Sequence, residues 1–194
     1  KIPYIRQLRI HQTENIWITN NEFQSIKELE GLDDLYKRLF FFYRETGLRL
    51  RETSIAELSG RWLDIPCESK THSERHIELD DRLLMVYAEL MEWVSSGYGS
   101  RLKTPFGHIS KKFKQALRDI GVDEKKNFHS LRHTFAVRSL IKGVSIYELK
   151  LLMGHSSVTT TECYSNINLK RVSQDFPTLA SKEQEAVKLV KRDT

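Results

Sequence analysis

The sequence lacks several features on which secreted and membrane proteins depend. Its 194 residues include only two cysteines, Cys67 and Cys163, which form no CxxC pair, so a disulfide framework is not expected. A reducing compartment, the cytoplasm, is the expected location. No apolar run approaches the ~20 residues of a membrane-spanning helix, and no signal peptide is visible. These absences argue against the disulfide-rich secreted class and the membrane-spanning class.

Charge, by contrast, is abundant. Charged residues make up 29% of the chain and hydrophobic residues 39%, which suits a folded domain. The net charge is +5, a mild basic excess that is compatible with a polyanionic partner but does not require one. The length suits one medium domain. Because the chain begins with Lys1 and not with Met, we expect it to be part of a longer protein.

Hydrophobic periodicity and capping residues predict a mainly helical chain. Thr19 and Glu22 have the spacing of a capping box at the start of the first helix. The apolar run 39–43 reads as a buried helix, for which Gly47 is a C-terminal stop. The helices are expected over 18–30, 33–47, 51–60, 80–97, 108–121, 129–143, 145–154 and 156–165.

Two stretches, 61–66 and 74–79, alternate polar and apolar residues as half-buried strands do. With 67–73 as the turn between them, they predict a small antiparallel sheet. There are no internal repeats and the loops are short. The fold class is therefore predicted to be mainly α with a small antiparallel β-sheet (α+β), in one compact domain.

The stretch HSLRHTFAV (129–137) places His129, Arg132 and His133 within about one helical turn. The two histidines are four residues apart, and such a pair shares a helix face and could bind a metal. However, Ser130 stands where the HExxH motif has glutamate, and the arginine adds a fixed positive charge, so no metal is expected. The histidines could be capping or packing groups. An anion site explains all three residues together, because each can donate hydrogen bonds.

Two other segments carry polar residues at helix junctions: TGLRLRE (46–52) and LLMGHSSVTTTECY (151–164). Taken singly, Arg49 reads as a surface charge. Tyr164 alone reads as a core or surface tyrosine.

Taken together, "TGLR..E", "HxLRH" and "GH" followed nine residues after the histidine by Tyr resemble the tyrosine recombinase (phage integrase) family. Three separated motifs in the family's order rarely coincide by chance. The resemblance runs from Ile18 to Leu179 and implies the family's catalytic, DNA breaking-rejoining fold. It implies a linker from an N-terminal core-binding domain over 1–17, the catalytic domain over 18–180 and a polar tail over 181–194.

The resemblance also implies the site. The catalytic residues would be Arg49, Lys70, His129, Arg132, His155 and Tyr164. Lys70 is assigned because Arg75 follows it five residues later, which is the family's usual hairpin spacing. The family commonly has glycines around this lysine, and this chain has none there. Glu52 and His133 are expected to support the catalytic residues.

The implied partner is double-stranded DNA, contacted mainly through its phosphates. Lys111, Lys112 and Lys114 are candidate contacts, with a solvated helix face as the alternative reading. Arg51 stands where the family has a small residue and would contact phosphate or solvent. The family usually assembles as a tetramer on two DNA sites, although an isolated catalytic domain could be a monomer. No cofactor and no metal are expected.

A C-terminal segment of such proteins packs on a neighbouring subunit. Leu169, Val172 and Phe176 have helical spacing suited to that role. The equal alternative is that they pack on their own domain.

The expected chemistry follows from these residue types. Two arginines can hold the non-bridging oxygens of a phosphodiester. Tyr164 would attack, a neutral His129 could accept its proton, and Lys70 would protonate the leaving 5′ oxygen. His155 would donate to a non-bridging oxygen. The resemblance implies a prokaryotic recombinase or integrase working through a 3′-phosphotyrosine without ATP or metal. The alternatives are a type IB topoisomerase, a catalytically idle DNA-binding relic and a metal-dependent phosphodiesterase.

Overall fold

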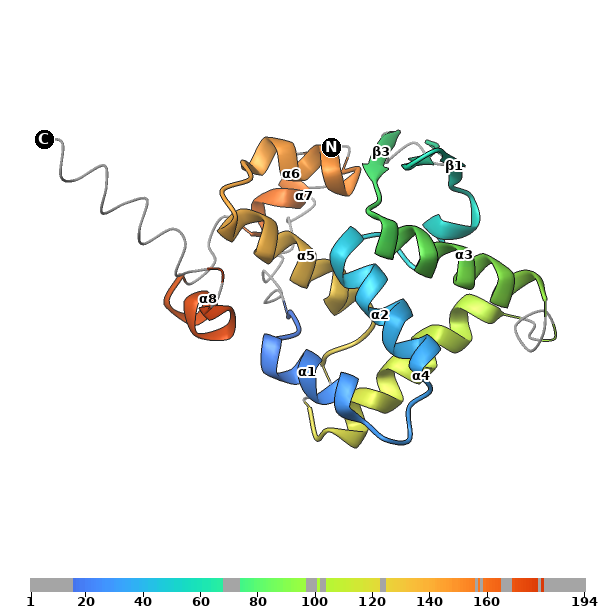
Figure 1. Cartoon of the computed structure of the whole chain (residues 1–194). Coiled ribbons are helices and arrows are strands. Elements are labelled where there is room, and N and C mark those ends of the chain that lie inside the picture. The colour runs from blue at the N-terminus through green and yellow to red at the C-terminus, as the bar shows by residue number, and fades with distance from the viewer. Residues whose placement is uncertain are drawn as a thin grey trace, which may run out of the picture.

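The computed structural model describes residues 16–67, 74–96, 101, 104–122, 125–155, 157, 159–164, 169–177 and 179. Within them the chain forms mainly helices and one small sheet (Figure 1). The elements in chain order are α1 (Asn20–Glu28), α2 (Asp34–Thr46), the 3-10 turn η1 (Glu52–Ser54), β1 (Glu57–Ser59), β2 (Trp62–Ile65), β3 (Arg75–Glu78), α3 (Asp81–Ser95), α4 (Pro105–Asp119), α5 (His129–Ile141), α6 (Ile146–Met153), α7 (Thr159–Glu162) and α8 (Leu169–Asp175).

Local capping chemistry sets where several helices begin and end. The predicted capping box at the start of α1 is confirmed, with Thr19 and Glu22 exchanging side-chain and backbone hydrogen bonds. Helix α2 ends at Gly47, which adopts the left-handed conformation with φ 66°. Helix α4 begins at Pro105, three residues before the predicted start, because proline is well suited to the first turn of a helix.

The prediction of a helix over 51–60 is wrong. Only the short turn η1 is helical there, and residues 57–59 form β1, which pairs antiparallel with β2. All three residues of β1 are exposed, so the strand has no alternation of burial that its sequence could reveal. Its conformation is set by backbone pairing with β2, an interaction that helix periodicity does not report.

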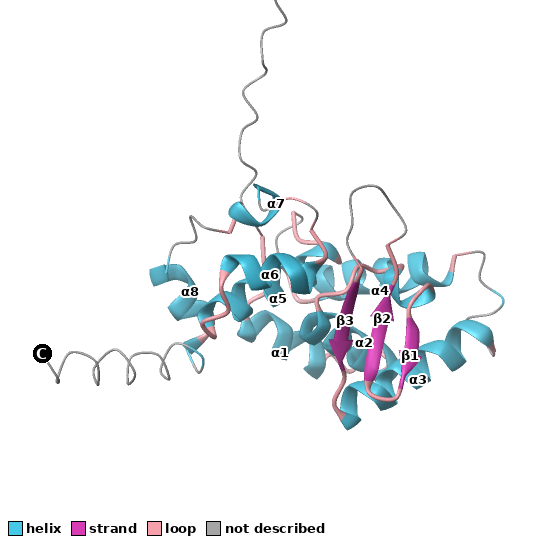
Figure 2. Ribbon diagram, turned by 90° about the horizontal axis from the view of Figure 1, so that it is seen from above, coloured by secondary structure: helices cyan, strands magenta, loops and turns pink. Residues whose placement is uncertain are grey.

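The predicted antiparallel pairing of the other two strands is confirmed. The sheet has the order β1-β2-β3, and Ile65 of β2 lies opposite Arg75 of β3 (Figure 2). Leu63 and Ile65 are buried, and this burial attaches the sheet to the helices. The register therefore brings Arg75, at the first position of β3, to the end of the sheet nearest the segment 68–73.

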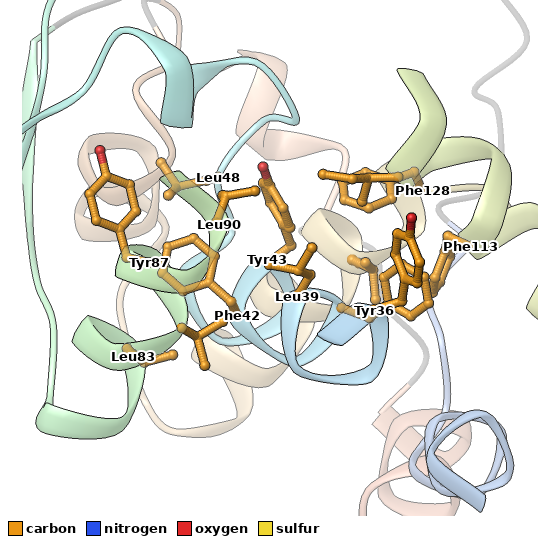
Figure 3. Close-up of a cluster of buried hydrophobic side chains, with 14 of the residues drawn as sticks. Tyr36, Leu39, Phe42, Tyr43, Leu48, Leu83, Tyr87, Leu90, Phe113 and Phe128 are labelled. Atoms are coloured by element: carbon orange, nitrogen blue, oxygen red, sulfur yellow. The ribbon is translucent and has the colours of Figure 1, made fainter. Parts of the chain in front are cut away.

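Helix α2 is the centre of the larger core, where it packs against α3, α4 and α5 (Figures 1 and 3). The predicted burial of the run 39–43 is confirmed for most of it, since Phe40 and Tyr43 have no exposed surface. The Phe40 ring meets Phe113 of α4 edge to face at 4.8 Å, and the Tyr43 ring meets Phe128 at 4.9 Å. This aromatic packing holds the residues that follow α2 against the start of α5.

A second buried cluster joins α8 to α5 and α6. Val172 and Phe176 are buried in it, so these two pack on their own domain, as the alternative predicted. The side chain of Leu169, the third residue of that prediction, lies outside those described. Trp17 is buried in the same cluster and donates a hydrogen bond through Nε1 to Asp175 at 2.8 Å. Among the described helices, none is long and apolar enough to cross a membrane.

Candidate active site

Glu52 is a buried carboxylate at the centre of an arginine cluster. Its Oε1 accepts a hydrogen bond from Arg49 Nη1 at 2.7 Å, and its Oε2 accepts one from the Arg49 backbone N–H at 2.6 Å. Arg75 of β3 donates to Oε2 as well. Burial alone would raise the pKa of Glu52, but the hydrogen bonds and charge of Arg75, then those of Arg49, lower it to about 2. Glu52 is therefore ionised at neutral pH and orients two arginines.

Arg132 is the most deeply buried charge of the cluster, with 2% of its surface exposed. Its Nη1 donates to the carbonyl of Gly47 at 2.6 Å, and its Nη2 donates to the carbonyl of Met153. Burial and then the nearby charge of Arg49 lower the pKa of Arg132 to about 9, so it still carries its charge at neutral pH. One guanidinium thus connects the end of α2, the end of α6 and its own helix α5.

His155 lies against this guanidinium. Its Nε2 is 3.1 Å from Arg132 Nη2, and its Nδ1 is 3.0 Å from the hydroxyl of Thr161. Because a guanidinium can only donate, Nε2 accepts and the ring proton lies on Nδ1. The ring nitrogen nearest Arg132 is thus an acceptor, and the donation of His155 to a phosphate oxygen stays a prediction.

The turn that places His155 requires a glycine. Gly154 ends α6 in the left-handed conformation with φ 61°. A Cβ at this position would overlap the guanidinium of Arg75. The backbone at Gly154 is thus both left-handed and in close contact with an arginine of the cluster.

Tyr164 lies in the turn directly after α7, and not on a helix as predicted. Its side chain is buried, and its hydroxyl is 2.6 Å from Nδ1 of His133. Burial raises the pKa of Tyr164, so the hydroxyl holds its proton at neutral pH. The hydroxyl is therefore bonded by His133 and not by His129, the proton acceptor that the motif had suggested.

The two histidines of α5 lie one helical turn apart and touch. Their ring centroids are 4.8 Å apart and their planes are perpendicular. Burial, followed by the electrostatic influence of His129 and then of Arg132, lowers the pKa of His133 to about 4. The pKa of His129 is lowered by burial and then by Arg132 and Arg49. Both rings are therefore neutral at neutral pH.

A cleft of about 280 Å³ opens beside these residues. It brings together Arg49, from the loop after α2, and His129 and Arg132, from α5. The full lining is Leu48, Arg49, Leu50, Ser110, Asn127, Phe128, His129 and Arg132. Two guanidinium groups and a neutral imidazole in one cleft suit the binding of an anion such as a phosphodiester.

Lys70 lies in the segment 68–73, outside the described residues, so its role stays a prediction. Arg75, which served in the sequence only to mark the spacing to that lysine, belongs to the arginine cluster around Glu52. The only signal in the sequence was its place at the start of a predicted strand. Among the described residues, no group of three or more His, Cys, Asp or Glu side chains is arranged to hold a metal ion.

The four predicted DNA-contacting residues differ in their surroundings. Arg51, Lys111 and Lys112 are exposed. Lys114 is only partly exposed, and its ammonium donates to the backbone carbonyl of Lys126 at 2.8 Å. Lys114 therefore has a role within the domain that the sequence pattern did not indicate.

The chain is similar to known recombinases. It matches the model of the phage integrase family over residues 17–171. It is 29% identical over 132 residues to the tyrosine recombinase XerC of Chlamydia caviae, which covers 68% of this chain and 38% of that protein. In fold it resembles the crystal structure of XerA recombinase, with a TM-score of 0.63 and 20% identity over 82% of this chain and 64% of that one.

A second structure of similar fold is the Tn1549 transposon integrase in complex with transposon right end DNA, with a TM-score of 0.60 and 16% identity over 89% of this chain and 69% of that one. The chain spans less than two thirds of the length of the curated relatives it matches. The family model, however, covers most of the chain, and the fold is that of tyrosine recombinase catalytic domains. The chain belongs to the phage integrase family of tyrosine recombinases.

Proposed function

We propose that this chain is the catalytic domain of a site-specific DNA recombinase or integrase. It would cleave and rejoin DNA strands through a covalent 3′-phosphotyrosine, without ATP or a metal ion. The observation that carries the proposal is the position of Arg132, whose guanidinium joins the segments that bear Arg49 and His155. The same helix α5 reaches Tyr164 through His133. Double-stranded DNA is the proposed partner, and a tetramer on two DNA sites is proposed for the full-length protein.

The cleft between Arg49 and Arg132 is the proposed site of the scissile phosphate. Fixed donors that meet the charge developing on phosphate oxygens contribute on the order of 3 kcal/mol each to catalysis. Glu52 would hold Arg49 in place without contacting phosphate, since like charges repel. With two arginines at the phosphate, the negative charge of the transition state can be stabilised by protein groups alone.

Tyr164 is the proposed nucleophile. Its oxygen would bond to phosphorus while the bond to the 5′ oxygen breaks, and Lys70 is the proposed donor of a proton to that oxygen. The covalent ester keeps the energy of the phosphodiester bond, so a 5′-hydroxyl from another strand can attack it and complete the exchange. The hydroxyl is buried in contact with His133, so the phosphate must approach it there before it can react.

The test is the substitution Tyr164→Phe, assayed on a pool of nicked duplexes with randomised sequence on both sides of the nick. The wild-type chain should form a covalent adduct through the 3′ end, and Tyr164→Phe should form none while still shifting DNA in a gel. Tyr147→Phe, at an exposed tyrosine of α6, is the matched control and should behave as wild type.

Other outcomes would favour the alternatives. A covalent adduct that survives in Tyr164→Phe would refute the assignment of the nucleophile. Relaxation of a supercoiled plasmid without preference for a sequence would favour a type IB topoisomerase. Loss of the reaction in EDTA would favour a metal-dependent phosphodiesterase, and DNA binding without any adduct would favour an idle relic.

A further inference from the structure

His133 touches the reacting group, although the family resemblance implies only a supporting role for it. We propose that His133 is the proton acceptor for the Tyr164 hydroxyl during cleavage and returns that proton during rejoining. The inference rests on the proposed function and assigns one step of it to a residue outside the motif's catalytic set.

His133 and Tyr164 are close enough for a direct proton transfer. Nδ1 of His133 lies 2.6 Å from the hydroxyl oxygen of Tyr164, and the ring centroids are 5.8 Å apart. A candidate general base must reach the proton that it abstracts, and this distance is within hydrogen-bond range. Among the described side chains, no other forms a hydrogen bond with that hydroxyl. His133 therefore satisfies the geometric requirement without any rearrangement.

The protonation states of Tyr164 and His133 suit a transfer from the hydroxyl to the ring. The buried tyrosine keeps its proton, and the buried imidazole is neutral. A neutral imidazole has one nitrogen with a free electron pair, and a phenol has one proton to share. The proposed step takes the hydroxyl as the donor to Nδ1, which places the ring proton of His133 on Nε2. In that tautomer the free electron pair of Nδ1 faces the proton to be transferred.

His129 and His133 lie in different surroundings. His129 lines the cleft beside Arg49 and Arg132, where the phosphate is proposed to bind. His133 stands one turn further along α5, behind the ring of His129, and faces Tyr164. Burial is the largest cause of the lowered pKa of His133, and His129 and then Arg132 lower it further. A bound phosphodiester brings a negative charge that opposes the effect of the arginine.

In the proposed step, each bond that forms is matched by one that breaks, and each proton has a donor and an acceptor. As the tyrosine oxygen bonds to phosphorus, its proton passes to Nδ1 of His133, and the bond from phosphorus to the 5′ oxygen breaks. The 5′ oxygen takes a separate proton from the general acid, for which Lys70 is proposed. In rejoining, a 5′-hydroxyl attacks phosphorus, and the His133 imidazolium returns its proton to the tyrosine oxygen as that bond breaks.

The first experiment compares His133→Asn with His133→Ala in single-turnover cleavage of the nicked duplex pool. Asparagine places an acceptor oxygen near the position of Nδ1, but it cannot take a proton. If His133 is the base, both variants should form the adduct about 10²- to 10⁴-fold more slowly than wild type. If His133 only positions Tyr164, His133→Asn should keep most of the rate, and that result would overturn the proposal.

Two controls separate this role from others. His76→Asn, at an exposed histidine of β3, should leave the rate unchanged. A substrate with sulfur in place of the bridging 5′ oxygen does not need a proton on its leaving group. It should restore cleavage by Lys70→Ala and should not restore cleavage by His133→Asn. Restoration of His133→Asn would mean that His133 serves the leaving group and not the nucleophile.

A second experiment needs no DNA and no substitution of His133. Nitrogen-15 NMR of the full chain at neutral pH should show His133 with a bare Nδ1 and a protonated Nε2. Tyr164→Phe should shift the Nδ1 resonance, because it removes the hydrogen bond. A proton on Nδ1 would refute the proposed direction. A wild-type chain that forms no adduct would instead refute the proposed function, so the two failures are distinct.

Discussion

Arg75, at the start of β3, donates a hydrogen bond to the carboxylate of Glu52, in the turn after α2. Both side chains are buried. The pair joins the sheet to the loop that carries Arg49, and so it links two parts of the proposed site that are far apart in the sequence. Glu52 compensates only part of the positive charge of the three arginines around it, so the cluster keeps a net positive charge for an anionic substrate.

Substitution of Glu52 by glutamine should destabilise the fold. The change leaves Arg75 buried without its anionic partner, and breaking a buried ion pair in this way costs about 3–5 kcal/mol. Urea denaturation would measure the loss. Glu57→Gln, at an exposed position of β1, should stay within about 0.5 kcal/mol of wild type. An equal, small effect of both substitutions would contradict the structural role of the Glu52–Arg75 pair.

The same carboxylate predicts a loss of stability in acid. The pKa of Glu52 falls from 4.5 to about 2 on folding, so its contribution of about 3 kcal/mol is fully present above pH 4.5. That contribution declines as the pH drops below 4.5 and is lost below pH 2, where the folded protein also binds the proton. Unfolding measured across this range should show the decline in wild type. Glu52→Gln should remove this part of the pH dependence, and an unchanged profile would contradict the assignment.

Substitution of Gly154 by alanine should disturb the site as well as the helix end. A left-handed alanine costs about 1–2 kcal/mol, and the added methyl group would also displace the guanidinium of Arg75. Gly121→Ala is the matched control, since Gly121 has φ 70° and open space around its missing Cβ. Thermal denaturation and adduct formation should both suffer more in Gly154→Ala. Equal losses in the two variants would mean that only backbone strain matters.

Tyr43 should support the loop that carries Arg49. Its buried hydroxyl donates to the carbonyl of Leu50 at 2.9 Å and lies 2.8 Å from the hydroxyl of Thr53. Tyr43→Phe removes both contacts, although Thr53 still donates to the Leu50 carbonyl at 3.2 Å, and should cost about 0.5–1.5 kcal/mol of stability. It should also slow adduct formation, since Arg49 lies in the same loop. The exposed Tyr147 again provides the control, and a neutral result for Tyr43→Phe in both assays would refute this role.

The lysines of α4 should separate into two groups. Replacing Lys111 or Lys112 by alanine should weaken DNA binding and reduce the slope of log affinity against log salt by about 1 for each lysine that contacts phosphate. Replacing Lys114 should lower stability instead, because its ammonium holds the carbonyl of Lys126. Binding titrations at several salt concentrations, with denaturation in parallel, would test this. A reduced salt slope and unchanged stability in Lys114→Ala would reverse its assignment.

Much of the local structure could be read from the sequence because local interactions specify it. The capping box of Thr19 and Glu22 and the stop at Gly47 depend on residues within a few positions of each other. The strand over 57–59 could not be read in this way. Its residues are exposed on both faces, and what makes them a strand is pairing with β2.

The sequence by itself determined the order and spacing of the motif residues, and these indicated the family and the candidate site residues. Tertiary structure alone decided which groups touch. His129 and His133 lie one turn apart on α5, and the sequence does not show which of them contacts Tyr164. His133 makes the hydrogen bond because of the way the turn after α7 packs against α5. Arg75 likewise joins the site only because the sheet register brings it to Glu52. Spacing along one helix follows from backbone geometry, whereas contacts between distant segments depend on the packing of the whole core.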